Sequence, residues 1–148
     1  MGDSTAASAS STPPVITHEN QANTEVLIPP TLKFLLSNIK NVIHIQLLPD
    51  NYPTWRSAIH KLFAANNFSG YLDGTQPAPP KHLLTATGQL TLNPQFSSWT
   101  LVDQNLSVAL FSTISASILP YVLNLETTAS IWHTLDQRFY STNRSRVI

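Results

Sequence analysis

The side chains that could hold a metal or carry out acid-base chemistry are few and scattered. The five histidines, at positions 18, 44, 60, 82 and 133, show no His-x-x-x-His or His-x-x-Glu-His spacing. Such a spacing would place two ligands on one face of a helix. The chain has no cysteine, which excludes a thiolate nucleophile, a disulfide and a zinc site built with cysteine. We therefore predict no metal site and no cofactor.

Motifs typical of enzymes are also missing from the sequence. There is no Gly-x-Ser-x-Gly, no glycine-rich loop for phosphates and no pair of carboxylates placed for general acid and base catalysis. The segment Asp73-Gly74-Thr75 has the composition of the Asp-Thr/Ser-Gly nucleophile of retroviral-type proteases but the wrong order, and it is typical of a turn. We predict no catalytic residue, no small-molecule substrate and no enzymatic activity.

One carboxylate lies in an unusual place. Asp103 follows Trp99 by four residues and precedes Leu106 by three, which puts it beside a predicted apolar helical stripe. An unpaired carboxylate there would be costly. We predict that Arg56, next to Trp55, reaches Asp103 and fixes how the two helices cross. The alternative is that Asp103 lies at an exposed edge.

The three tryptophans have two interpretations. Trp55, Trp99 and Trp132 each fall on an apolar helical face, where large aromatic side chains contribute buried area. They could instead stack on nucleobases, but nucleic-acid platforms interleave aromatic with basic residues and these stripes do not. Eight Lys and Arg balance eight Asp and Glu, so the positive charge that neutralises phosphates is missing. We favour core tryptophans and expect RNA to bind weakly if at all.

The elements that would position these residues are helices. Residues 1–28 have little apolar content and predict a disordered tail, so the folded domain is placed at residues 29–148. A short helix can start after Pro30, and residues 42–47 alternate as an extended segment does. Asn51 and Pro53 begin a helix that runs to about Asn66, with Trp55, Ile59, Leu62 and Phe63 on its apolar face.

The second half of the domain is predicted to hold the longest helix. Residues 73–93, rich in proline, predict a long surface loop, and Asn93-Pro94 starts a helix that continues to the serine-rich stretch before Pro120. Glu126-Thr127-Thr128 caps a last helix that ends near Tyr140. The residues that follow, 143–148, resemble the start of another helix. Together these elements predict an all-α fold, a small helical bundle.

Neither a membrane span nor a targeting segment is predicted. Residues 104–125 carry no charge, but serines and Pro120 dilute them, and Asp103 and Glu126 flank them. The first residues lack the basic and apolar regions of a secretory signal. We expect no membrane partner. The location of the protein in the cell stays unknown, and is expected to be the cytoplasm if the gene is expressed.

Five short motifs, in order, resemble the Gag region of plant copia-type retrotransposon polyproteins. The first is the Asn-Tyr-x-x-Trp helix start at Asn51 to Trp55, within Leu48 to Arg56. The others are Gly70-Tyr-Leu-Asp-Gly-Thr with prolines after it, Asn93-Pro-x-Phe-x-x-Trp-x-x-x-Asp, Ile114-x-x-Ser-Ile-Leu-Pro, and Thr128-Ala-Ser-Ile-Trp-x-x-Leu with Phe139. Together they span about residues 38–148.

The resemblance implies a capsid-like helical domain that assembles into particles packaging element RNA. Its motif core would be Tyr52, Trp55, Trp99, Trp132, Leu135 and Phe139. In that family a Cys-Cys-His-Cys zinc knuckle follows the helical region, and this chain has no cysteine. We therefore expect a C-terminally truncated copy whose partner is itself or full-length Gag.

Three functional hypotheses follow from this resemblance. The first is a structural, Gag-derived protein that associates with its own copies through apolar surface at residues 119–125 and at Val147-Ile148. The second is an RNA-binding or other nucleic-acid-binding module, favoured by the family and opposed by the net charge of zero. Basic residues at Arg138, Arg144 and Arg146 are interpreted as solvated charge near a helix end rather than as an RNA strip. The third is a degenerate retrotransposon fragment without activity.

Overall fold

The computed structural model describes residue 2 and residues 28–140. The predicted tail lies outside these residues except at its positions 2 and 28, and so does the helix start predicted at 143–148. Five α-helices and one two-stranded sheet make up the described part. The predicted helical fold is therefore confirmed, with one small sheet that the sequence did not predict.

Helix α1 (Pro30–Val42) begins at a proline and is longer than the short helix predicted there. Its Leu32, Leu35 and Ile39 are buried at helical spacing. The chain then becomes extended, as predicted, and Leu47 forms an isolated parallel bridge with Ile114. Leu47 is fully buried, so this bridge brings the segment before α2 next to the segment after α4.

Helix α2 (Tyr52–Ala65) starts where Asn51 and Pro53 predicted. Asn51 accepts a hydrogen bond from the Leu48 backbone N–H (2.7 Å) and donates one to the Gln46 carbonyl (2.8 Å), which closes the turn before the helix. The predicted apolar face is buried. Helix α3 (Ser69–Asp73) folds back after it and ends at Gly74, whose φ of 80° is one that glycine adopts without strain.

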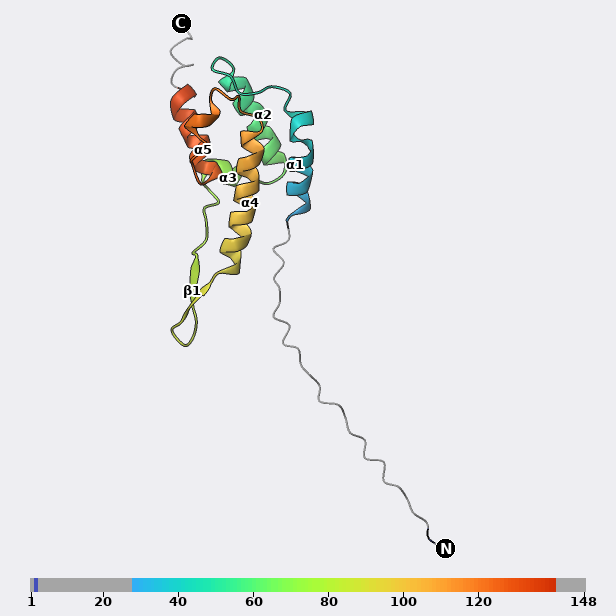
Figure 1. Ribbon diagram of the computed structural model, residues 1–148, viewed down its shortest axis with the longest axis vertical. Helices are drawn as coiled ribbons and strands as arrows, with labels where there is room; N and C mark the ends of the chain where they lie inside the picture. The colour runs from blue at the N-terminus through green and yellow to red at the C-terminus, as the bar shows by residue number, and fades with distance from the viewer. Residues whose placement is uncertain (1, 3–27, 141–148) are drawn as a thin grey trace.

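The predicted loop at residues 73–93 contains a β-hairpin. Strands β1 (His82–Leu84) and β2 (Leu90–Leu92) pair antiparallel, with His82 opposite Leu92 and Leu84 opposite Leu90. Gly88, with φ of 82°, permits the tight connection. The prolines at 77, 79 and 80 indicated a loop for the whole segment, but both strands lie after these prolines. Figure 1 shows the hairpin extending away from the helices, beyond the start of α4.

Helix α4 (Pro94–Phe111) is the longest, as predicted, and ends where the serine-rich stretch before Pro120 begins, with Ser112 as its C-cap. The Ser112 hydroxyl donates to the Ala109 carbonyl (2.6 Å) and the Thr113 hydroxyl to the Leu110 carbonyl (2.7 Å). Such side-chain bonds to the last carbonyls compete with continuation of the helix. Pro120 lies instead in the short 3₁₀-helix η1 (Leu119–Tyr121).

Helix α5 (Thr128–Leu135) continues into a π-helical turn, η2 (Asp136–Tyr140), which matches the predicted end near Tyr140. Thr127 is its N-cap and forms a capping box with Ser130, so the cap predicted at Glu126-Thr127-Thr128 is confirmed.

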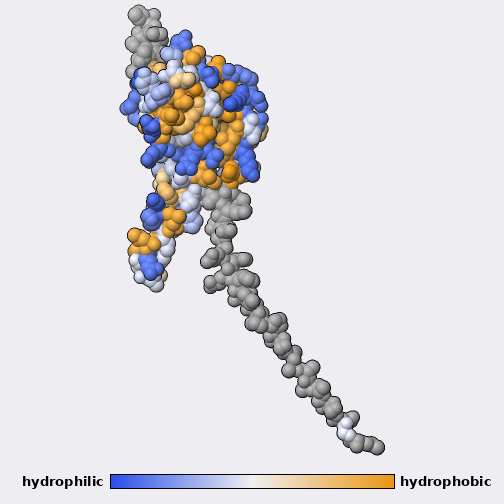
Figure 2. Space-filling model, in the orientation of Figure 1, coloured by the Kyte–Doolittle hydropathy of each residue, from blue (hydrophilic) through white to orange (hydrophobic). Residues whose placement is uncertain are grey.

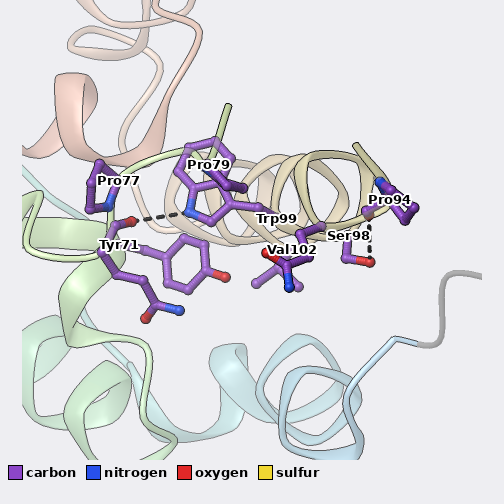
Figure 3. Close-up of a pocket in the computed structure, with 9 residues that line it drawn as sticks. Tyr71, Pro77, Pro79, Pro94, Ser98, Trp99 and Val102 are labelled. Atoms are coloured by element: carbon purple, nitrogen blue, oxygen red, sulfur yellow. Dashed lines mark hydrogen bonds between the residues drawn. The ribbon is translucent and has the colours of Figure 1, made fainter. Parts of the chain in front are cut away.

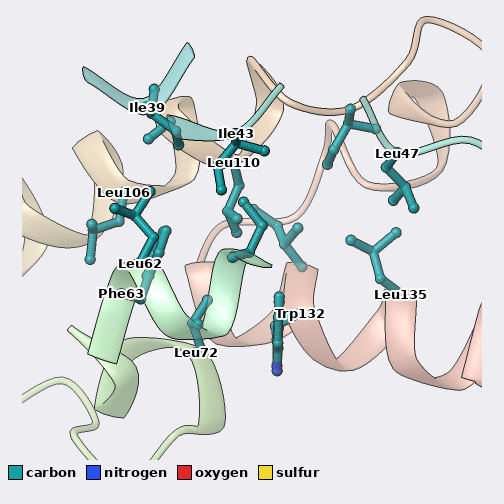
Figure 4. Packing of buried hydrophobic residues seen from close by; sticks show 14 of the residues in the cluster. Ile39, Ile43, Leu47, Leu62, Phe63, Leu72, Leu106, Leu110, Trp132 and Leu135 are labelled. Carbon is teal, nitrogen blue, oxygen red and sulfur yellow. The ribbon is translucent and has the colours of Figure 1, made fainter. Parts of the chain in front are cut away.

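The core lies where all five helices meet, with a contribution from the extended segments (Figure 4). Trp132 and Leu135 of α5 lie opposite α2 and the Leu47 segment, and Leu106 and Leu110 of α4 lie near Ile43, Leu62 and Phe63. Among the residues that the structure describes, no helix combines the length and the apolar character needed to cross a membrane.

Asn93 joins the hairpin to α4. Its side-chain oxygen accepts from the Gln95 N–H (3.0 Å), its amide donates to the Pro80 carbonyl (2.8 Å), and its backbone N–H donates to the Lys81 carbonyl (2.8 Å). This side chain is therefore both the N-cap of α4 and a clamp at the base of the hairpin.

We predict that Asn93→Ala lowers the free energy of unfolding by about 1–2 kcal/mol, since both side-chain bonds are lost. Asn93→Ser, which keeps a capping oxygen but not the amide donor, should lose about half as much. Urea unfolding followed by circular dichroism measures both. Equal losses for the two variants would mean that the cap contributes nothing.

Candidate functional site

An ion pair ties α2 to the end of α5. The Arg56 Nε donates to the Asp136 carboxylate at 2.7 Å and a terminal nitrogen donates to its second oxygen at 3.2 Å. The Tyr52 hydroxyl donates to the same carboxylate. The pair is partly exposed, at 35% for the Arg56 side chain and 29% for that of Asp136. The guanidinium also lies over the Trp132 ring, 5.1 Å from its centroid.

The prediction that Arg56 pairs with Asp103 is wrong. The structure does not bring Arg56 to Asp103. Asp103 is 2% exposed, and its side chain accepts from the Thr128 backbone N–H at 3.1 Å. The Thr128 hydroxyl donates to the Asp103 carbonyl at 2.9 Å. Asp103 is thus buried and partnered, but at the start of α5, where a carboxylate is favourably placed against the helix dipole.

The pKa values of the Asp136 and Asp103 carboxyl groups are shifted in opposite directions. Burial alone would raise the pKa of Asp136, but the bonds from Arg56 and Tyr52 outweigh it and hold this pKa below its ordinary value. Burial raises the pKa of Asp103, and the bonds from Thr128 offset only part of the effect. Burial, followed by the bond to Asp136, also raises the pKa of the Tyr52 hydroxyl strongly. Because the lone pairs of Asp136 are engaged by two donors, this carboxylate is poorly suited to act as a base.

Five of the six motif-core residues lie in the interior. Tyr52, Trp55, Trp132, Leu135 and Phe139 are all buried, and the rings of Tyr52 and Trp55 pack against Phe139 and Trp132 at centroid distances of 5.7 and 5.8 Å. The Trp55 indole N–H donates to the Thr113 hydroxyl (3.2 Å), so the polar atom of this ring is satisfied.

Trp99 is the exception, because it is only partly buried. It lies in the second turn of α4, near the end of the bundle, where its ring stacks on Tyr71 at 5.6 Å. Its N–H donates to the Gln76 carbonyl (3.0 Å). Figure 3 shows Trp99 and Tyr71 beside Pro77 and Pro79, lining a pocket of about 460 Å³. The prediction that Trp99 is a core residue therefore holds only in part, because Trp99 packs against the core cluster and also forms the wall of a surface pocket.

Two groups of exposed apolar side chains bear on the predicted self-association. In the hairpin, Leu83, Leu84, Leu90 and Leu92 are all exposed. In the segment predicted for self-association, Tyr121 and Leu123 are exposed, Val122 is fully buried, and Leu119 and Leu125 pack partly against the core. Other exposed apolar side chains of the described residues are Phe34, Val42, Ile45, Leu48, Val108 and Tyr140. Figure 2 shows apolar surface both on the hairpin and on the visible face of the helical part. Val147-Ile148, also predicted to contribute, lies outside the described residues.

No group of three metal-binding side chains occurs in residue 2 and residues 28–140. Asp73-Gly74-Thr75 forms the predicted turn, in which the Asp73 carboxylate accepts from the Thr75 N–H at 2.9 Å. The candidate functional surface of this chain is the exposed apolar surface of the hairpin and of Tyr121 and Leu123.

Two features of the site were missed from the sequence. Asp136 follows Trp132 by four residues, and Arg56 follows Trp55 by one. Residues four apart share a helical face, so packing of Trp55 on Trp132 brings Arg56 close to Asp136. That spacing could have predicted the pair. A weaker indication of the hairpin was present in the sequence, namely the threonines and leucines on both sides of Gly88.

Two relatives were found among known proteins. The chain is similar to the retrovirus-related Pol polyprotein from transposon RE2 of Arabidopsis thaliana, with 35% identity over 98 residues, which are 66% of this chain and 6% of that polyprotein. It is also 32% identical over 114 residues to the one from transposon RE1 of the same plant, covering 77% of this chain and 8% of that polyprotein. The chain spans less than a tenth of the length of these curated relatives. No protein-family profile and no solved structure matches it.

We predict that Asp136→Asn lowers the free energy of unfolding by about 1–2 kcal/mol near neutral pH, because it weakens a charged hydrogen-bonded pair that is partly exposed to solvent. The folded-state pKa of Asp136 is depressed, so its contribution is present above the ordinary value of 3.8 and is lost as the pH falls through the lower folded value. The gap between wild type and variant should therefore close in acid.

Urea unfolding at a series of pH values tests this prediction. Asp50→Asn is the matched control, since Asp50 is an exposed carboxylate in the turn before α2. A gap that stayed constant down to acid pH would contradict an ionic contribution.

For Asp103 the opposite dependence is expected. Its raised folded pKa means that ionisation costs stability as the pH rises through that value. Asp103→Asn keeps the oxygen that accepts from Thr128 and should equal or exceed the wild type by up to about 1 kcal/mol near neutral pH, whereas Asp103→Ala should lose about 1–2 kcal/mol. The same unfolding series measures both. Equal destabilisation by the two variants would show that the charge itself supports α5.

Proposed function

This chain belongs to the family of copia-type retrotransposon polyproteins, and on that premise we propose that it is a Gag-type structural segment that acts by associating with copies of itself. The proposal includes a capsid-like role in particle assembly. It assigns no catalysis to this segment, since its two buried or half-buried carboxylates, Asp103 and Asp136, are engaged in bonds that hold helices together.

The observation that carries the proposal is the apolar surface left outside a complete core. Leu84 and Leu90 of the hairpin are 71% and 69% exposed, and Tyr121 and Leu123 are more than half exposed. Contiguous apolar residues on the outside of a folded domain mark surfaces that contact other proteins. A chain with eight positive and eight negative charges also lacks the net charge by which copies would repel one another.

Charge argues against the alternative of an RNA-binding module. The exposed apolar surface carries few basic residues, and Arg138, the basic residue nearest to Tyr121, lies over that ring, 3.4 Å from its centroid. RNA retention would have to come from Lys and Arg side chains that neutralise phosphates, and would weaken steeply with salt.

We expect the molar mass of the chain, measured by light scattering over a concentration series at moderate salt, to rise with concentration towards a defined oligomer. In parallel, retention of RNA should be weak. A folded monomer at all concentrations would contradict the proposed self-association, and salt-sensitive RNA binding by that monomer would favour the nucleic-acid module instead.

A further inference from the structure

The leucines of the hairpin form a strip on one side of it. Because Leu84 pairs with Leu90, and Leu92 is two residues further along β2, these three side chains share one face of the two-stranded sheet. Leu83 and Thr91 pair on the opposite face. All three leucines of the strip are exposed. Figure 1 shows the hairpin that carries them projecting away from the helices. A two-stranded hairpin with an uncovered apolar face gains stability only when something packs on it.

An apolar groove lies at the base of the same strip. It has a volume of about 370 Å³ and is formed by β2 and one side of α4, with Leu92, Phe96, Thr100 and Leu101 among its lining residues. Ser97 and Gln104 complete the α4 side, and Lys81 is its one charged lining residue. Leu92 belongs to both features, so the strip leads directly into the groove.

Helix α4 explains why this groove is apolar. Its core side carries Val102, Leu106 and Leu110, whereas Phe96 and Leu101 lie towards the groove and Val108 is exposed. A helix with apolar residues all round is normally covered on all sides. In this chain α1 and α5 cover α4 on two sides, and the groove side is left open.

The hairpin is held in place relative to the groove. The three hydrogen bonds of Asn93 described above fix Pro80, Lys81 and the first turn of α4 together. Strip and groove therefore have a set geometry before any partner binds, which lowers the entropic cost of binding.

We propose that the strip of one copy (Leu84, Leu90 and Leu92) packs into the α4 groove of a second copy, and the reverse, in a two-fold dimer. This inference rests on the proposed self-association and names its surface. A chain that carries both the protruding apolar strip and the apolar groove is complementary to itself, as a two-fold interface requires.

Charge favours a second copy over other occupants. Residues 82–92 contain no Asp, Glu, Lys or Arg, so two hairpins can approach without like-charge repulsion. A nucleic acid or an anionic lipid surface would require a cluster of basic residues, and the groove offers one lysine.

The first test compares the two faces of the hairpin. The double variant Leu84→Ser, Leu90→Ser should weaken self-association at least about tenfold in light scattering or sedimentation, because each leucine would be a buried anchor. Leu83→Ser, on the opposite face of the same strand, should change it less than about twofold and is the matched control. All three substituted leucines lie outside the core cluster, so the helical circular dichroism should be unchanged.

The second test detects the contact itself. The chain has no cysteine, so Leu84→Cys in one preparation and Gln104→Cys in another introduce single thiols. Mixed and oxidised, they should form a disulfide-linked heterodimer faster than a mixture of Leu83→Cys and Gln104→Cys. Equal rates in the two mixtures would overturn the assigned packing.

The outcomes separate the two proposals. A wild-type chain that stays monomeric would sink self-association and this interface together. The wild type and the Leu84→Ser, Leu90→Ser variant could associate equally while the Tyr121→Ser, Leu123→Ser variant does not. That result would keep the proposed function and move the interface to residues 119–125. A monomer that binds phosphatidylcholine vesicles only with the strip intact would overturn the second copy as occupant.

Discussion

The buried indole of Trp55 imposes the constraint on which much of the fold depends. A fully buried ring must find an acceptor for its N–H, and Thr113 supplies it at 3.2 Å. The same hydroxyl donates to the Leu110 carbonyl, so the residue that satisfies α2 also ends α4. The chain just beyond is then held along the Leu47 segment, with the Leu47 N–H bonded to the Thr113 carbonyl and the Ser115 N–H to the Leu47 carbonyl. One threonine therefore connects three stretches that are far apart in sequence.

The two ends of α5 are fixed by different electrostatic means. At its start, Asp103 accepts from the Thr128 N–H, and the Thr127–Ser130 capping box satisfies further donors. At its end, Asp136 binds Arg56 and Tyr52 of α2. Asp103 is paired with a backbone N–H, and burial raises its pKa. Asp136 is paired with a cation, which lowers its pKa. This difference is why the two groups are expected to respond to pH with opposite signs.

The proposed self-association gives a role to the exposed leucines of the hairpin. Leu83, Leu84, Leu90 and Leu92 are all exposed on a hairpin that contributes nothing to the core cluster, and other exposed apolar side chains lie elsewhere on the described residues. Asn93 nevertheless fixes the base of the hairpin, so the structure holds a protruding element whose apolar side chains are exposed to solvent. That arrangement agrees with the proposed assembly of a polyprotein segment.

The sequence by itself determined where three of the helices, α2, α4 and α5, begin, but it did not predict the short helix α3. Asn51-Tyr52-Pro53, Asn93-Pro94 and Thr127-Thr128 are local signals, since a cap or a proline acts within one turn, and the structure begins a helix at each. The buried face of α2 followed from its spacing for the same reason. The end of α4 and the hairpin also rest on local bonds, although the hairpin was not predicted. The partner of Arg56 and the exposure of Trp99 were decided only by tertiary structure. Which carboxylate an arginine meets depends on residues tens of positions away, and no local preference specifies which of them arrives.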